Sequence, residues 1–199
     1  MPFFTFNRLI FCILATAMLV TRLHHVGSVP DASWAVLFLG GFYLRGPGAF
    51  AALMLEAAAI DYIATQHLGV SSYCLSPAYA MLLPSYAALW LGGAWAHRHW
   101  KGPRALSVVE FSMSLLISVS FCFLLSNGSF YWLSGRASSP NFAGWLVSFR
   151  QWYPHFLLIP CAYVGVTAMI HMSARWLRRI LRGSGSPHGD ADVIRGSTP

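Results

Sequence analysis

Charged residues are scarce in this chain. Asp, Glu, Lys and Arg make up only 10% of its 199 residues, whereas 56% of the residues are hydrophobic. A soluble domain carries about 25% charged residues, so this composition excludes the ordinary soluble class. The alternating segments of about ten residues that a membrane β-barrel needs are absent as well. The sequence therefore predicts an all-α integral membrane protein.

The common enzyme motifs are also missing. The sequence contains no HExxH zinc-protease motif, no GxSxG nucleophile motif and no Walker A phosphate loop. Without a nucleotide site, the chain cannot by itself use ATP to drive transport. The absence of these motifs leaves open whether the protein is an enzyme.

Six apolar segments recur along the chain, and all but the short second one are about long enough to cross the roughly 30 Å hydrocarbon core as helices. Ala15-Thr16-Ala17 imitates a signal-peptidase site, but hydrophobicity continues past it, so we expect the first span to be retained. The six spans predict one transmembrane domain over residues 1–182. They cover about residues 3–23, 32–44, 48–68, 78–96, 105–125 and 153–177.

Two segments outside the spans are more polar. Residues 126–152 form a long aromatic stretch that fits either a lid or pocket wall or a plain connection. Residues 183–199 are rich in Gly, Ser and Pro, which predicts a disordered cytoplasmic tail.

The basic residues are distributed unevenly between the two sides of the predicted spans. With the N-terminus inside, ten of the thirteen Lys and Arg residues fall on the cytoplasmic side, and only Arg22, Arg136 and Arg150 fall on the other. This asymmetry predicts that both termini are inside. It also accounts for the net charge of +7 as an orientation signal and a contact with anionic lipid, so no nucleic-acid partner is needed.

Cys74 stands apart from the other cysteines. Cys12, Cys122 and Cys161 fall inside apolar spans, where we expect them to act as small buried hydrophobes. Cys74 lies in the outward-facing loop YCLSPAY, residues 73–79, without a second Cys or His in CxxC or CxxH spacing. Three roles remain open for it, namely a packed loop residue, an intermolecular disulfide, or a ligand or nucleophile.

The ligand role of Cys74 has a preferred chemistry. A closed zinc site needs four ligands in compact spacing. The histidines are scattered along the sequence and do not give Cys74 such a set of ligands. A single thiolate is better suited to supply one axial ligand to a metal whose other positions are filled by a macrocycle.

Several polar residues are predicted at the same outer end as Cys74. They are Asp61 near the end of the third span, Tyr79 at the start of the fourth, and His24 and His25 after the first. Asp61 fits either contact with a polar ligand or a hydrogen bond to a neighbouring helix. Glu56 is no partner for Asp61, because five residues along a helix separate the two side chains by about 140°.

The eight histidines lie near span edges or in the tail, which argues against a haem held across the bundle. A membrane redox protein with one haem at the edge therefore remains an alternative function. A structural or assembly subunit without a ligand is a second alternative.

Three stretches of sequence carry a resemblance to a known family. They are FLGGFYLRGPGAFA between the second and third spans, AIDYIATQ around Asp61, and SSYCLSPAYAMLLPSY around Cys74. Over roughly residues 5–182 the chain resembles the BtuM family, small cobalamin-transport proteins related to the S-components of energy-coupling factor (ECF) transporters. The resemblance implies an S-component-like fold in a bacterial inner membrane, with vitamin B12 bound at the outer face and taken up.

The resemblance also implies roles for particular residues. Cys74 would be the axial ligand to the cobalt of cobalamin and would displace cyanide from cyanocobalamin, as catalysis or as simple ligand exchange. Asp61 and Tyr79 would be its neighbours in the site. His24 and His25 are assigned there by position only.

The first span departs from the pattern of S-components that share an energising module. Many of those proteins carry an AxxxA docking pattern, whereas this chain has Ala15 and Ala17 in ATAML. The expected partners are therefore cobalamin and the lipid bilayer, while an ECF-type energising module lacks its usual docking signal.

Overall fold

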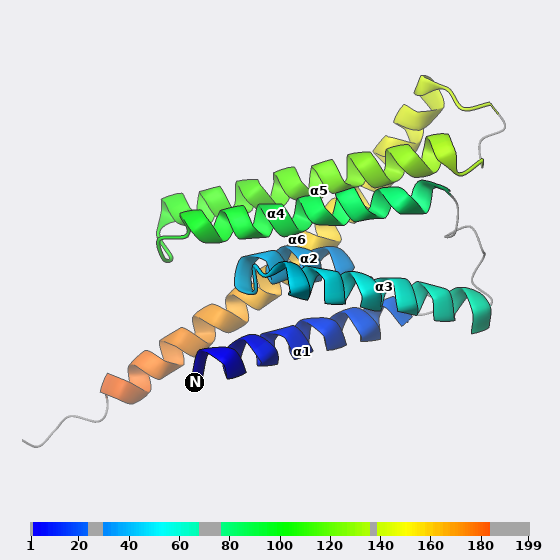
Figure 1. Cartoon of the computed structure of the whole chain (residues 1–199). Coiled ribbons are helices and arrows are strands. Elements are labelled where there is room, and N and C mark those ends of the chain that lie inside the picture. The colour runs from blue at the N-terminus through cyan, green and yellow to red at the C-terminus, as the bar shows by residue number, and fades with distance from the viewer. Residues whose placement is uncertain (1, 24–29, 68–76, 136–138, 184–199) are drawn as a thin grey trace, which may run out of the picture. The chain divides into compact units, whose positions relative to one another are not determined.

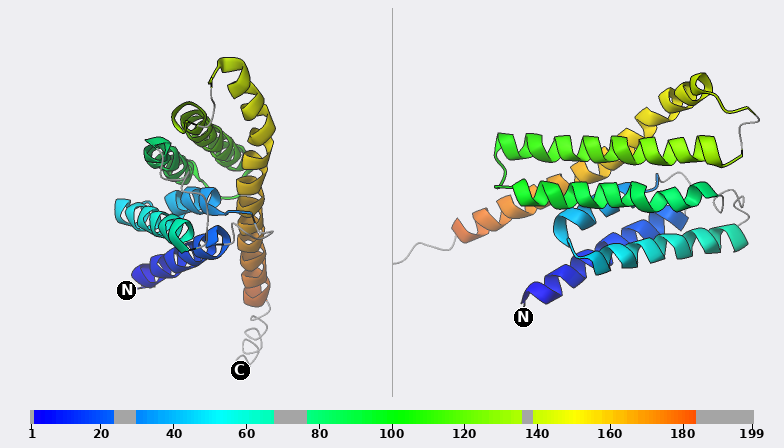
Figure 2. Two further views of the ribbon diagram at one scale, coloured as in Figure 1. Left: turned by 90° about the vertical axis from the view of Figure 1, so that its right-hand side faces the viewer. Right: turned by 45° about the horizontal axis from the view of Figure 1, so that its top comes forward.

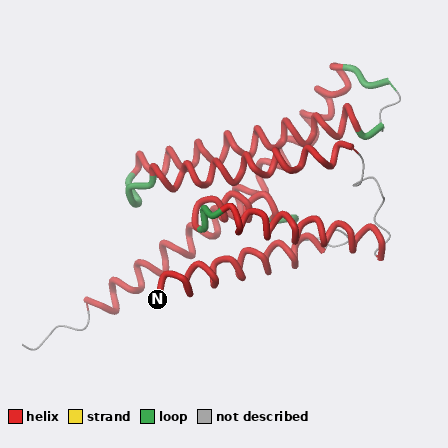
Figure 3. Tube along the Cα trace, viewed as in Figure 1, coloured by secondary structure: helices red, strands yellow, loops and turns green. Residues whose placement is uncertain are grey.

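The computed structural model describes residues 2–23, 30–67, 77–135 and 139–183. Most of these residues are helical, and no strand occurs in the described ranges (Figures 1 and 3). The predicted all-α class is confirmed. The elements are α1 (Pro2–Leu23), α2 (Ser33–Tyr43), α3 (Pro47–His67), the 3-10 helix η2 (Pro77–Met81), α4 (Leu82–His99), α5 (Ala105–Leu133) and α6 (Phe142–Gly183).

Four of these helices are long and apolar enough to cross a membrane, namely α1, α3, α5 and α6. Their outer faces carry large exposed apolar side chains such as Ile13, Leu55 and Ile117, as expected for helices that face lipid. The structure thus supports a multi-pass helical membrane protein. Six spans with both termini inside remain a prediction, since α2 is short and α4 is less apolar.

The segment 126–152 was expected outside the helical spans, and in this respect the structure differs. Most of it is helical, because α5 continues to Leu133 and α6 already begins at Phe142. The hydroxyl groups of Ser126 and Ser129 donate hydrogen bonds to carbonyl groups of the preceding turn, so these polar residues are accommodated within α5. Asn141 caps α6 by accepting a hydrogen bond from the Gly144 amide at 2.8 Å.

Helix α2 forms the centre of the core. Its residues 33–42 are all buried, and a helix that is apolar on every side is typical of an interior position. It spans only 11 residues, which rise about 16 Å, so it is too short to cross the hydrocarbon core by itself. Helix α2 packs against α1, α3 and α4, and α4 in turn runs beside α5 (Figure 2).

Glycines let α2 and α4 approach backbone to backbone. A Cβ atom at Gly41 would overlap the carbonyl group of Trp90, and one at Gly93 would overlap that of Phe38. The small residues of YAALWLGGAWA therefore permit close helix packing, as their composition suggests.

The chain divides into two compact units. Unit 1, Met1–Val164, holds α1 to α5 and the first part of α6, and unit 2, Gly165–Pro199, holds the rest of α6. The core and the site described below lie in unit 1. The predicted domain over residues 1–182 and the tail over residues 183–199 stay predictions.

Candidate functional site

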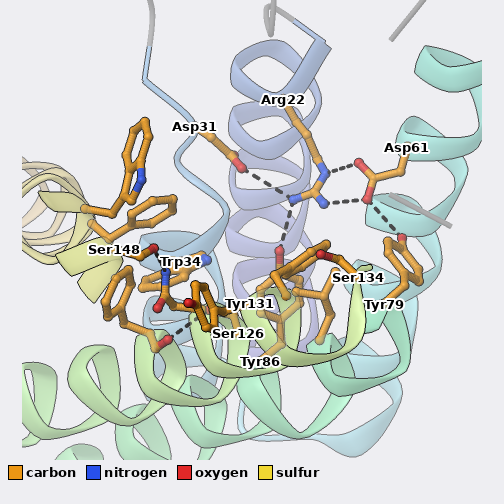
Figure 4. Close-up of a pocket in the computed structure, with 16 residues that line it drawn as sticks. Arg22, Asp31, Trp34, Asp61, Tyr79, Tyr86, Ser126, Tyr131, Ser134 and Ser148 are labelled. Carbon is orange, nitrogen blue, oxygen red and sulfur yellow. Dashed lines mark hydrogen bonds and ion pairs between the residues drawn. The ribbon is translucent and has the colours of Figure 1, made fainter. Parts of the chain in front are cut away.

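A cavity of about 720 Å³ lies in unit 1, near the end at which α3 finishes and α4 begins (Figure 4). Its volume falls within the roughly 300–1,000 Å³ of typical small-molecule sites. Half of the sixteen lining residues are aromatic, and most of the others carry hydroxyl, amide or charged groups. The lining residues are Arg22, Asp31, Trp34, Asp61, Tyr79, Leu82, Tyr86, Phe123, Ser126, Asn127, Phe130, Tyr131, Ser134, Ser148, Trp152 and Phe156.

Arg22 in the last turn of α1 is the centre of the polar wall. Its Nε donates to Oδ1 of Asp61 at 2.7 Å, and its Nη2 donates to Oδ2 of Asp61 at 2.6 Å. The two side chains are only 6% and 11% exposed. A buried arginine charge is tolerated when a carboxylate pairs with it in this two-point geometry, so the contact fixes α1 against α3.

The remaining nitrogen of the Arg22 guanidinium connects two further elements. Nη1 donates to the Ser33 hydroxyl at the start of α2, at 2.9 Å, and to the Tyr86 hydroxyl of α4, at 3.3 Å. It also lies 3.4 Å from Oδ2 of Asp31. One side chain thus joins four helices at this end of the cavity. Figure 4 shows its contacts with Asp31, Asp61 and Tyr86.

Tyr79 completes the polar wall from η2, the short helix that precedes α4. Its hydroxyl group donates to Oδ2 of Asp61 at 2.9 Å. A phenol keeps its proton at neutral pH, so the Tyr79 hydroxyl acts as the donor in this contact. The structure therefore brings together Asp61 and Tyr79, which the sequence placed in one site.

The opposite wall comes from α5 and α6. The Phe156 ring packs against Trp34 and Phe123 at centroid distances of 5.1 and 5.5 Å. Next to these rings, the Asn127 amide donates to the Ser148 hydroxyl at 3.4 Å. Part of the segment 126–152 therefore forms a pocket wall, which was one of its two predicted roles, although it does so as helix.

Three predicted site residues, Cys74, His24 and His25, lie outside the described residues. Their assignments remain predictions. In the sequence, Cys74 is five residues before Tyr79, and His24 is two residues after Arg22.

Two charged residues of the cavity, Arg22 and Asp31, were not predicted as site residues. The sequence analysis used Arg22 only to predict the orientation of the spans. An arginine inside an apolar span usually pairs with an acidic residue, so Asp61 could have been assigned as its partner. Asp31 was not considered at all. Asp31 lies two residues before Ser33, at the start of an apolar run. An acidic side chain in this position commonly caps a helix, and this pattern could have indicated Asp31.

The other candidate ligands of the sequence do not gather at the cavity. No described histidine lines it, and the described ranges contain no group of three or more His, Cys, Asp or Glu residues that could hold a metal ion. Cys122 is buried as expected, whereas Cys12 is exposed, because it lies on the outer face of α1. Glu56 does not line the cavity, in agreement with its predicted separation from Asp61.

The sequence matches no protein-family model, and no curated protein matches it significantly. The resemblance to the BtuM family therefore rests on the stretches quoted above.

Proposed function

We propose that the protein binds cobalamin in this cavity and mediates its uptake across the inner membrane. One observation carries the proposal. Asp61 and Tyr79, which the resemblance assigns to the cobalamin site, bond to each other on the wall of a large aromatic cavity. Cys74 is five residues before Tyr79 in the sequence. Five residues of extended chain span at most about 18 Å, so Cys74 is tethered within that distance of Tyr79.

The cavity suits the general chemistry of a corrinoid. A corrin ring is broad and largely apolar on its faces, and its edge carries carboxamide groups. The aromatic rings of Trp34, Phe123 and Phe156 supply apolar surface, and a few polar side chains supply hydrogen bonds. Ligand sites generally combine these two features.

The cobalt belongs to the substrate, and four corrin nitrogens already hold it. The protein needs to supply one soft axial ligand, which is the chemistry of a thiolate. In the proposed exchange, the Cys74 thiol loses its proton and a cobalt–sulfur bond forms. The cobalt–carbon bond of cyanocobalamin breaks, and cyanide leaves with the electron pair, so no redox partner is required.

Uptake through the usual AxxxA docking face is not part of the proposal. Ala15 and Ala17 are both partly buried and pack against the core of unit 1. Residues in such positions present little surface to a separate energising module.

Growth of a bacterial strain that depends on imported B12 tests the proposal. The wild-type protein should rescue growth at low cobalamin and retain corrinoid on purification, whereas Cys74→Ala should lose most of both. Cys12→Ala is the matched control, because Cys12 is exposed on α1 far along the sequence from the loop. Failure of the wild-type protein to bind any corrinoid would end the proposal.

A further inference from the structure

We infer that Asp31 is the carboxylate that contacts the ligand, whereas Asp61 serves to position Arg22 and Tyr79. In this assignment, Asp31 accepts a hydrogen bond from a carboxamide N–H at the edge of the corrinoid. The inference rests on the proposed function and adds to it a residue that selects amide-bearing ligands.

The Asp61 carboxylate is engaged within the protein. Its Oδ1 accepts from Nε of Arg22, and its Oδ2 accepts from both Nη2 of Arg22 and the Tyr79 hydroxyl. Its side chain is only 11% exposed. A ligand that bonded to Asp61 would have to compete with these short contacts.

Among the described residues, Asp31 is firmly bonded through one of its two oxygens. Its Oδ1 accepts from the Ser33 amide at 2.9 Å and from the Ser33 hydroxyl at 2.6 Å. Within the part of the chain that the structure describes, its Oδ2 has one long contact, 3.4 Å to Nη1 of Arg22, and the side chain is 31% exposed. A carboxylate offers about four acceptor positions, so Asp31 retains acceptor capacity on the wall of the cavity.

The backbone around Asp31 is held in place. The Tyr163 hydroxyl donates to the carbonyl group of Pro30 at 2.8 Å, and the Ala32 amide donates to the hydroxyl of Thr21 at 3.1 Å. A binding group positioned by such contacts loses little conformational freedom when the ligand arrives. Figure 4 shows Asp31 and Asp61 on opposite sides of the Arg22 guanidinium.

The charges of the cavity favour an amide over a carboxylate on the ligand. Among the described residues that line the cavity, the charged groups are Arg22, Asp31 and Asp61, one positive and two negative. Because Arg22 pairs more closely with Asp61 than with Asp31, the excess negative charge of these three groups lies mainly at Asp31. A ligand amide would donate to this carboxylate, whereas a ligand carboxylate in the same place would be repelled.

The test compares cobalamin with the monocarboxylic acids made by hydrolysing one side-chain amide at a time. The wild-type protein should bind at least one of these acids roughly tenfold more weakly than cobalamin, the size expected when a hydrogen bond to a charged group is lost. Asp31→Asn should bring the two affinities to within about twofold, because the neutral amide no longer repels the acid. Asp61→Asn should weaken both ligands alike.

The outcomes separate the two proposals. If cobalamin binds but the wild-type protein treats every acid like the amide, the inference fails and the proposed function stands. The same holds if Asp31→Asn keeps the wild-type preference. If neither ligand binds the wild-type protein, the proposed function fails and the inference fails with it. Because the wild-type comparison needs no variant, the test does not depend on the folding of Asp31→Asn.

Discussion

Arg22 and Asp61 form a two-point ion pair that is almost closed off from solvent, with N–O distances of 2.7 and 2.6 Å. The pair joins the last turn of α1 to α3, 39 residues away along the chain. Its main consequence is that each charge depends on the other, because a buried charge without a partner is strongly destabilising.

Asp61→Ala should therefore destabilise the protein severely. Among the described residues, the guanidinium of Arg22 would keep only the long contact with Asp31 as counter-charge. The expected loss is about 3–5 kcal/mol, or roughly 10 °C in the melting temperature of the protein in detergent. The double variant Arg22→Met, Asp61→Leu should recover most of this loss, because apolar side chains remove both charges together. A melting temperature of Asp61→Ala equal to that of the wild type would contradict the structure at this point.

Tyr79→Phe should have a smaller effect. Asp61 would lose one donor but keep both contacts with Arg22, so the expected loss of stability is about 1–2 kcal/mol. Tyr62→Phe is the matched control, because Tyr62 lies on the exposed side of α3 and should be neutral. Thermal melting of the two variants side by side measures the difference, and equal melting temperatures would show that the Tyr79 hydroxyl contributes nothing.

The packing of α2 on α4 leads to a third prediction. Gly93→Ala should cost about 1–3 kcal/mol, because the new methyl group meets the backbone carbonyl of Phe38, which cannot move independently of α2. Gly165→Ala in α6 meets nothing within 4 Å, so it should be neutral or stabilise the helix by up to about 1 kcal/mol. Chemical denaturation of both variants checks this contrast, and the reverse order would contradict the helix contact.

The aromatic wall gives a fourth prediction. Trp152→Ala should weaken cobalamin binding by roughly tenfold or more, because the indole is a large part of the apolar lining and is still 47% exposed in the absence of ligand. Its effect on folding should be small for the same reason. Trp176→Ala is the control, because Trp176 is 66% exposed on α6 and does not line the cavity. Isothermal titration with cobalamin measures the affinities of the two variants. Equal affinities would show that this aromatic wall does not contact the ligand.

Much of the fold follows from the sequence, because long apolar runs determine where the helices lie. The boundaries of α5 and α6 were harder to predict. Ser126 and Ser129 read as polar, yet inside a helix their hydroxyl groups are satisfied by the preceding turn. Local polarity does not reveal that contact, so the helical extension was missed.

The candidate site was predictable only in part. Asp61 and Tyr79 border the same loop in the sequence, and their proximity followed from the topology. The pairing of Arg22 with Asp61, and the neighbouring position of Asp31, depend on how three separate segments pack. Charge type alone suggests such partners, but it does not select among them.

X-ray absorption at the cobalt edge of protein loaded with cyanocobalamin tests the proposed bond between cobalt and Cys74. The wild-type protein should show a sulfur neighbour of cobalt and should release about one cyanide per bound cobalamin. Both signals should persist in Cys12→Ala and disappear in Cys74→Ala. A wild-type spectrum without sulfur at cobalt, with cyanide still bound, would contradict the account.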